Sequence, residues 1–324
     1  MKNKMKKVLL TLSLVMMFLS SCSQNNQKLI GVYAQDNTRY YILPDSKFII
    51  VAYATIIYGK WEVDDKNHLV LIPHNPEHRF IMYARSNPNI KDGYKIMFQG
   101  FEDDETFMGN EITKMYSVFN SDAGCFSFPY IYKFNKKNEL INLGYSVYDE
   151  SQQNNLYSFL TTNYNDFILS YIRKSQFYKP FYFKILKQGI QNIDRDKDIT
   201  IKKTLESLSD EDKKMIKDIN ASIKEDAIKC IVVNPSYKVF ENNIINQKEY
   251  VFDGKENAYI NKLNHNKNNN RFEDYNDSSI IYKYDKIEPQ AIKKSSFKKT
   301  SQSLFHVVCE NVKVDTIKFD KKGR

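Results

Sequence analysis

Residues 39–63, RYYILPDSKFIIVAYATIIYGKWEV, decide the fold of this chain. Isoleucine, valine, tyrosine and phenylalanine fill short runs, and residues 44–46, PDS, separate the first run from the next. β-Branched and aromatic side chains favour strands, whereas Pro, Asp and Ser favour turns. The stretch therefore predicts strands at residues 39–43, 48–58 and 60–63.

The same pattern of short apolar runs and turn residues continues outward from this stretch. Further strands are predicted at residues 69–72, 79–83 and 94–98, with turns at 64–67, 73–76 and 91–93. Closely spaced strands joined by polar turns are typical of an antiparallel meander. Residues 29–116 are therefore predicted to form a β-meander domain that closes as a small barrel or sandwich.

The clearest alternating pattern follows a polar stretch at residues 117–124, where we place a domain boundary. Aromatic residues occupy every second position of the next strand, namely Phe126, Phe128, Tyr130, Tyr132 and Phe134. Alternate side chains of a strand share one face. Residues 141–147 alternate again, so the two segments predict a hairpin with an aromatic face. Such a face either packs into a core or forms a platform for a glycan or a peptide.

One helix is predicted in this C-terminal domain, from Ser209 to about residue 229. Asp212 follows Ser209 by three residues, as in a capping box. Apolar residues then recur at helical spacing, namely Met215, Ile216, Ile219, Ile223 and Ala227. Strands are predicted at residues 179–186, 230–233, 250–252, 280–284, 304–309 and 312–319, and the Asn-rich residues 261–279 are predicted to form a surface loop or a disordered insertion. Residues 125–320 are therefore predicted to form an α+β domain with one main helix, in a chain that is β-rich overall.

The first 22 residues have a different character from the rest of the chain. Lysines at positions 2, 4, 6 and 7 precede a mainly apolar segment of twelve residues, 8–19. Twelve helical residues span about 18 Å, well short of the roughly 30 Å hydrocarbon core of a bilayer. The segment therefore predicts an export signal and not a membrane-spanning helix. The Leu19-Ser20-Ser21-Cys22 sequence that follows resembles the bacterial lipobox.

The lipobox resemblance implies a signal peptide at residues 1–21 and a bacterial lipoprotein that begins at Cys22. It implies a covalent lipid, with a diacylglycerol on the Cys22 sulfur and an acyl chain on its amine; several acyl chains together form a durable membrane anchor. No other cofactor is predicted. A polar tether at residues 22–28 has no acidic residue after the cysteine, which favours the outer membrane of the cell envelope, facing the periplasm.

The charge and the cysteines limit the classes of partner and fold. The net charge is +9, but four of the positive charges belong to the signal lysines. The remaining lysine excess is typical of solubility or of weak attraction to anionic lipid. The expected partners are therefore the membrane and an envelope protein or glycan, and not nucleic acid. Besides Cys22, the chain has Cys125, Cys230 and Cys309, an odd number that excludes a full disulfide framework and leaves one bridge open.

Gly59-Lys60-Trp61 resembles the lipocalin signature, in which the tryptophan closes one end of a ligand-binding barrel. In that family the signature lies on the first strand of the barrel. Two predicted strands precede it in this chain. We therefore interpret Trp61 as a core residue of the meander, with a lipocalin-like cavity as the alternative.

Two groups of residues come nearest to a metal site. His74, Glu77 and His78 lie close together in the sequence, but the prolines at positions 73 and 76 prevent the helix that would bring both imidazoles to one side. Asp194, Asp196 and Asp198 alternate as in a calcium loop. The sixth and twelfth positions of that loop should be Gly and Glu and are Ile and Leu here. The sequence therefore predicts no metal site.

No nucleophile elbow, phosphate-binding loop, paired-cysteine zinc site or metalloprotease helix is found in the sequence. No catalytic residue is predicted as a result. The sequence instead predicts a lipid-anchored cell-envelope protein with a binding or structural role, acting through protein or glycan contacts. The alternatives are a hydrolase of envelope polysaccharide or peptide, and a lipocalin-like carrier of a small ligand. The candidate binding residues are Trp61, Phe126, Phe128, Tyr130 and Tyr132.

Overall fold

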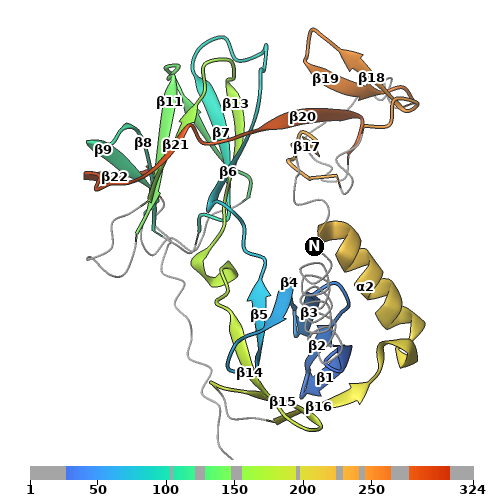
Figure 1. Ribbon diagram of the computed structural model, residues 1–324. Helices are drawn as coiled ribbons and strands as arrows, with labels where there is room; N and C mark the ends of the chain where they lie inside the picture. Colours follow the sequence, from blue (N-terminus) through green and yellow to red (C-terminus); the bar gives the residue numbers. More distant parts are fainter. Residues whose placement is uncertain are drawn as a thin grey trace, which may run out of the picture. The chain divides into compact units, whose positions relative to one another are not determined.

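A computed structural model describes residues 27–102, 105–120, 128–146, 155–194, 198–223, 229–240, 245–263 and 277–306 (Figure 1). Strands dominate these residues, and α2 is the one α-helix among them. The predicted fold class, β-rich with an N-terminal antiparallel barrel and one main helix, is confirmed. The signal peptide, Cys22 and most of the predicted tether lie outside the described residues.

The described residues form two compact units, and each unit takes two separate pieces of the chain. The first unit comprises residues up to 76 and residues 175–227, and the second comprises residues 77–174 and those from 228 onward. One piece of the second unit, residues 77–174, is therefore inserted between the two pieces of the first unit, and the other piece follows them. The boundary that we placed at residues 117–124 does not coincide with these divisions.

The first unit is a closed eight-stranded antiparallel barrel, drawn in the lower half of Figure 1. Its strands are β1 (Gly31–Gln35), β2 (Thr38–Ile42), β3 (Lys47–Ala52), β4 (Thr55–Val63), β5 (His68–Pro73), β14 (Phe181–Ile185), β15 (Gly189–Asn192) and β16 (Asp198–Lys203). Each strand pairs with its neighbour in the chain, except that β5 pairs with β14 and β16 closes on β1. The barrel predicted for residues 29–116 is thus completed by residues 181–203, and the segments at 79–83 and 94–98 belong to the second unit.

One predicted strand, residues 48–58, is two strands in the structure. β3 and β4 form a tight hairpin in which Ala52 pairs with Thr55. Tyr53 at the turn is 90% exposed, and Ala54 has a φ of 53°. The turn contains no Gly, Asn, Asp or Pro, the residues that usually mark such a bend. The continuous apolar run therefore predicted one strand and gave no sign of the turn.

Trp61 lies inside the barrel, as the core interpretation predicts. Its indole Nε1 donates a hydrogen bond to the carbonyl oxygen of Leu43 at 2.9 Å. A Cβ added at Gly59 would overlap the carbonyl oxygen of Ile72 on β5, so the close approach of these two strands requires glycine. The interior is occupied by a cluster of buried side chains that includes Tyr33, Ile42, Phe48, Trp61, Leu69, Leu71, Phe183 and Ile190. This packing agrees with the interpretation of Trp61 as a core residue.

The predicted helix is confirmed as α2 (Asp210–Ile223). The amide N–H of Asp212 donates to Ser209 Oγ at 3.1 Å, and that hydroxyl donates to Asp212 Oδ2 at 2.9 Å, so the predicted cap is present. Met215, Ile216 and Ile219 pack on a cluster of barrel residues, Val32, Tyr41, Leu43, Ile49 and Leu208. The helix therefore covers the outside of the barrel instead of belonging to a separate C-terminal domain.

The second unit contains two sheets that share one core. The first sheet has the order β10 (Tyr130–Phe134), β7 (Tyr94–Gln99), β13 (Asp166–Tyr171), β6 (Phe80–Arg85), β20 (Ile280–Ile287), β19 (Ala258–Asn261) and β18 (Tyr250–Asp253), and β17 (Cys230–Val233) also pairs with β20. The second has the order β21 (Ala291–Lys294), β12 (Asn155–Leu160), β11 (Leu140–Tyr145), β8 (Thr106–Glu111), β9 (Lys114–Phe119) and β22 (Lys299–Phe305). Buried side chains from both sheets form a single cluster, so the unit is a β-sandwich.

The predicted hairpin between residues 126–134 and 141–147 is wrong. β10 pairs with β7, whereas β11 pairs with β8 and β12, so the two strands belong to different sheets. The alternation itself is confirmed for the described part of β10, because Tyr130, Tyr132 and Phe134 all pack against the sandwich core. Phe126 lies outside the described residues, and Phe128 is 48% exposed.

The geometry of the insertion predicts that the barrel folds alone. Asn75 Nδ2 donates to the carbonyl oxygen of Tyr178 at 2.9 Å, and the Tyr178 amide donates to Asn75 Oδ1 at 3.0 Å, so the chain leaves and re-enters the barrel at adjacent points. We expect a variant lacking residues 77–174 and 228–324, with a short Gly-Ser linker joining 76 to 175, to give a β-type circular dichroism spectrum and one cooperative urea transition. A spectrum of unfolded chain would contradict this.

Candidate functional site

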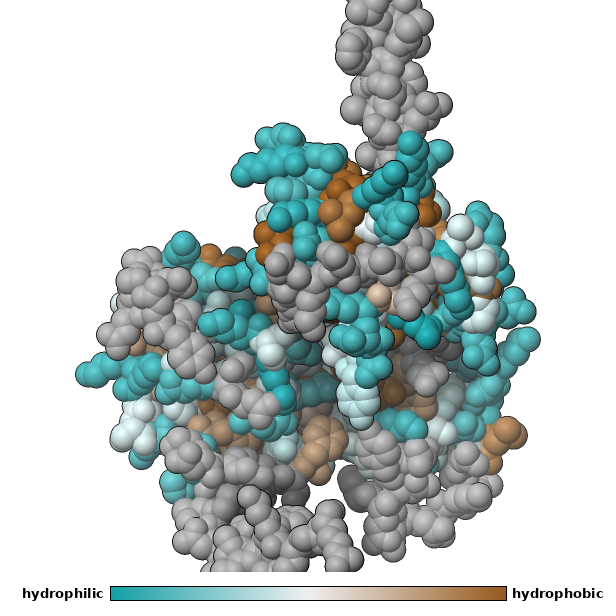
Figure 2. Space-filling model, turned by 90° about the horizontal axis from the view of Figure 1, so that it is seen from below, coloured by the Kyte–Doolittle hydropathy of each residue, from teal (hydrophilic) through white to brown (hydrophobic). Residues whose placement is uncertain are grey.

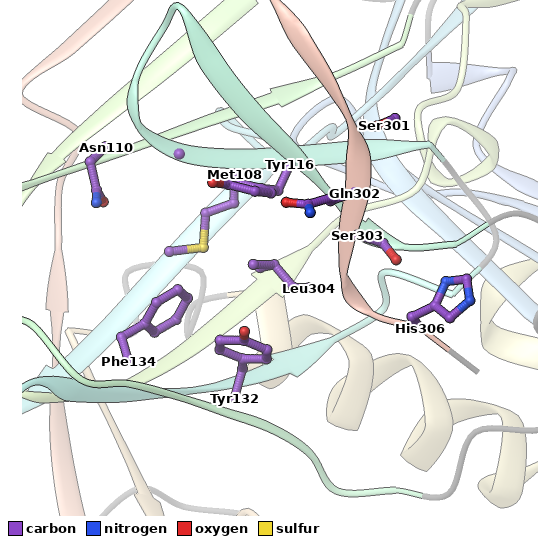
Figure 3. Close-up of a pocket in the computed structure, with 11 residues that line it drawn as sticks. Met108, Asn110, Tyr116, Tyr132, Phe134, Ser301, Gln302, Ser303, Leu304 and His306 are labelled. Carbon is purple, nitrogen blue, oxygen red and sulfur yellow. The ribbon is translucent and has the colours of Figure 1, made fainter.

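A cleft of about 680 Å³ opens in the sandwich unit between β10 of one sheet and β8, β9 and β22 of the other (Figure 3). It is lined by Met108, Gly109, Asn110, Tyr116, Tyr132, Phe134, Ser301, Gln302, Ser303, Leu304 and His306. This volume is within the range of about 300 to 1,000 Å³ that small-molecule sites occupy. We name this feature the sandwich cleft.

The period of two in strands places side chains in the sandwich cleft from both sides. On β10 the alternate residues Tyr132 and Phe134 point into it, and on β22 the alternate residues Gln302 and Leu304 do the same (Figure 3). The intervening Lys133 and Ile131 of β10 lie on the other face of their strand. Alternation along β10 and β22 thus determines which side chains line the cleft.

Aromatic contacts hold the two walls of the sandwich cleft together. Phe305 at the end of β22 stacks on Phe119 of β9 with ring centroids 4.9 Å apart, and it meets the edge of Tyr132 at 5.7 Å. The rings of Tyr132 and Phe134 are 4.7 Å apart. β22 runs parallel to β9, with Ser303 opposite Ser117. Phe305 therefore fixes the strand that carries Gln302, and pre-organised lining groups favour binding.

The polar groups of the sandwich cleft are available to a ligand. The side-chain amides of Asn110 and Gln302 and the hydroxyl of Tyr132 make no hydrogen bond within the described part of the chain. The hydroxyl of Tyr116 differs, because its hydrogen bond to Lys114 raises the pKa of that lysine. Three unengaged polar groups that converge on an aromatic-lined hollow form the usual arrangement of a binding site.

A second polar cluster lies on the other face of the sheet that contains β10. Asp166, fully buried, sits between Arg85 and Lys95, which pair directly with it on the neighbouring strands. Arg85 Nε donates to Asp166 Oδ2 at 3.0 Å, Lys95 Nζ lies 3.3 Å from the same oxygen, and Asn87 Nδ2 donates to it at 2.7 Å. The guanidinium also donates to the carbonyl oxygen of Asn257 at 2.9 Å. We name this feature the Asp166 cluster.

Tyrosines enclose the Asp166 cluster. The Arg85 guanidinium carbon lies 4.0 Å from the centroid of the Tyr282 ring, a cation–π contact. Burial raises the pKa of Tyr237 and of Tyr284, so both hydroxyls stay protonated at neutral pH. Arg85 and Lys95 both pair with Asp166 Oδ2 across three strands, whereas Asp166 Oδ1 is buried and has no hydrogen-bond partner among the described residues. Because these ion pairs join three neighbouring strands, we assign the cluster to holding the sheet in register.

This assignment predicts a large loss of stability when Asp166 is removed. Asp166→Ala leaves the buried Arg85 uncompensated, which should lower the free energy of unfolding by about 3 to 5 kcal/mol. Asp285→Ala is the matched control, because Asp285 pairs with Lys283 at 2.8 Å and is 56% exposed; its loss should be about 1 kcal/mol or less. Urea titrations of both variants measure the difference, and equal losses would contradict the assignment.

Of the candidate metal ligands His74, Glu77 and His78, the last two lie near each other. In the barrel unit, His74 stacks on Tyr58 with centroids 5.6 Å apart. In the sandwich unit, His78 Nε2 lies 3.8 Å from Glu77 Oε1 and 4.0 Å from Glu288 Oε2. The described residues hold no group of three or more His, Cys, Asp or Glu side chains placed to bind a metal ion.

The structure describes Asp194, Asp198 and Cys230 among the remaining predicted residues. Asp194 is exposed in the turn after β15, and its amide donates to Asn192 Oδ1. Asp198 begins β16, and Asp196 lies outside the described residues. Cys230 on β17 is a free thiol, whereas Cys22, Cys125 and Cys309 lie outside the described part. None of the helices in the described ranges is both long and apolar enough to cross a bilayer.

Of the predicted binding residues, Tyr132 lines the sandwich cleft, Tyr130 packs beside it on Phe119, and Trp61 belongs to the barrel core. The sequence analysis missed Asn110, Tyr116 and Gln302. Residues 299–305 read KTSQSLF, with too few apolar residues to signal the strand that carries Gln302. The sign of a strand in this segment is the alternation of Gln302 and Leu304 with the serines at positions 301 and 303.

On the face shown in Figure 2, patches of hydrophobic residues lie among hydrophilic residues. Comparisons of the chain with protein-family models, with curated proteins and with solved structures found no match. The sandwich cleft is therefore interpreted from its own geometry and chemistry.

Proposed function

We propose that this protein is a lipid-anchored binding protein of a bacterial cell envelope, and that it holds a glycan or a peptide of an envelope partner in the sandwich cleft. The observation that carries the proposal is the convergence of Asn110, Tyr132 and Gln302, with unengaged polar groups, on a hollow of about 680 Å³. Aromatic side chains supply contact area, and the few polar groups fix the orientation of the ligand.

The anchor is proposed from the sequence. A signal peptide that ends in Leu19-Ser20-Ser21-Cys22 supports lipidation of Cys22, and the uncharged residues 23–27 support a place in the outer membrane facing the periplasm. A lipid at the start of a short tether would keep both units close to the membrane surface. Binding would then concentrate the ligand, or its carrier, at the envelope.

The anchor is tested by Cys22→Ala. Wild-type cells should incorporate labelled palmitate into the protein, and the protein should fractionate with membranes. The variant should take up no label, because the thioether cannot form, and it should be released by salt washing. Cys230→Ala is the matched control and should remain labelled. Equal labelling of the wild type and Cys22→Ala would refute the lipid anchor.

The binding role is tested by thermal unfolding of the full-length protein, extracted in detergent, against polysaccharide and peptide fractions of the envelope. A ligand at 100 times its Kd stabilises by about 2.7 kcal/mol, which should raise the Tm by several degrees. The shift should vanish in Tyr132→Ala and persist in Tyr53→Ala, whose side chain is 90% exposed on the barrel. A shift that both variants retain would place binding outside the sandwich cleft.

A further inference from the structure

Resting on the proposed function, we infer that the ligand of the sandwich cleft is an uncharged oligosaccharide. Charged residues make up 27% of the chain, yet none of the 11 residues that line the cleft is Asp, Glu, Lys or Arg. Anionic ligands are normally held by Arg or Lys, and cationic ligands by carboxylates. A ligand with a charged group would find no Asp, Glu, Lys or Arg among the lining residues to offset its lost hydration, and His306 is the one lining residue whose side chain can carry a positive charge.

The polar groups suit hydroxyls that both donate and accept. The amides of Asn110 and Gln302 each present a carbonyl oxygen and an NH2 group, and the hydroxyl of Tyr132 can play either role. Figure 3 shows the Asn110 and Gln302 side chains extending from strands of the same sheet, with the Tyr132 hydroxyl rising from the opposite wall. Sugar hydroxyls have this same dual character, so each of these three groups finds a partner on such a ligand.

The apolar groups suit the C–H faces of a sugar ring. Tyr132 and Phe134 are only partly buried, so each ring has surface that a ligand can cover. Met108, which is buried, and Leu304 add apolar atoms between these rings and the strands opposite them (Figure 3). Covering aromatic surface is favourable in proportion to the area removed from water. Flat apolar surface beside neutral groups that both donate and accept hydrogen bonds is the combination that a saccharide requires, and on this match we assign the cleft to a saccharide.

The test is isothermal titration of the full-length protein, extracted in detergent, with three sets of short probes. The first set holds uncharged oligosaccharides of glucose, mannose, galactose and N-acetylglucosamine. The second holds the same backbones with uronate or sulfate groups, and the third holds uncharged tetrapeptides. We expect at least one member of the first set to bind, with a Kd that changes less than twofold between about 50 and about 500 mM salt, because no ionic contact is screened.

Variants assign that binding to the sandwich cleft. Tyr132→Ala should weaken it about tenfold by removing ring contact, and Gln302→Ala should weaken it several-fold by removing one hydrogen-bonding group. Gln302 is exposed, so its replacement leaves the fold intact. Tyr53→Ala and Gln188→Ala, at exposed turns of the barrel, are matched controls and should bind as the wild type does.

The outcomes separate this inference from the proposed function. Suppose that only the charged sugars or only the tetrapeptides bind, and that Tyr132→Ala weakens this binding. The inference of an uncharged sugar is then overturned, but the sandwich cleft remains a binding site. Binding of uncharged sugars that neither Tyr132→Ala nor Gln302→Ala weakens overturns the assignment of the ligand to this cleft. Failure of the whole first set to bind also overturns the inference, whereas the anchoring role is decided by the Cys22→Ala experiment alone.

Discussion

Hydrogen bonding between strand edges that are far apart in the sequence is the constraint on which the whole structure depends. The barrel exists only because β5 pairs with β14 across more than a hundred residues and β16 returns to β1. The sandwich has the same requirement, since β20 joins β6 and β22 joins β9. An unpaired strand edge exposes a row of backbone donors and acceptors. Each unit is complete only when its second chain segment covers such an edge.

Local signals in the sequence predicted the elements, and nonlocal pairing decided what they build. Ser209 and Asp212 lie within one helical turn, so the capping pattern located α2 correctly. Most predicted strands are present for the same reason, because alternation is a property of neighbouring residues. The partner of β10, which is β7, and one partner of β14, which is β5, lie far away in the sequence, and no local pattern identifies them. The turn at Ala54 was not predicted for a different reason. Ala54 adopts a positive φ, but the turn contains none of the Gly, Asn, Asp or Pro residues that usually mark one.

In the candidate site too, local patterns predicted some residues, and nonlocal strand pairing decided how they come together. Tyr132 was foreseen as part of an aromatic face, but the cleft beside it depends on β22, which pairs with β9 from almost two hundred residues away. Only this pairing brings Gln302 and Leu304 opposite Tyr132 and Phe134. Phe305 is the residue that secures it, through its ring contacts with Phe119 and Tyr132. The site is therefore a consequence of topology more than of any motif.

The placement of Trp61 has a practical consequence for spectroscopy. It is the chain's single tryptophan, and it lies in the barrel interior. Its fluorescence emission therefore reports the barrel and is silent about the sandwich, whose rings are tyrosine and phenylalanine. On one sample, tryptophan emission follows the barrel alone, whereas circular dichroism follows both units together, so a transition seen only by circular dichroism belongs to the sandwich.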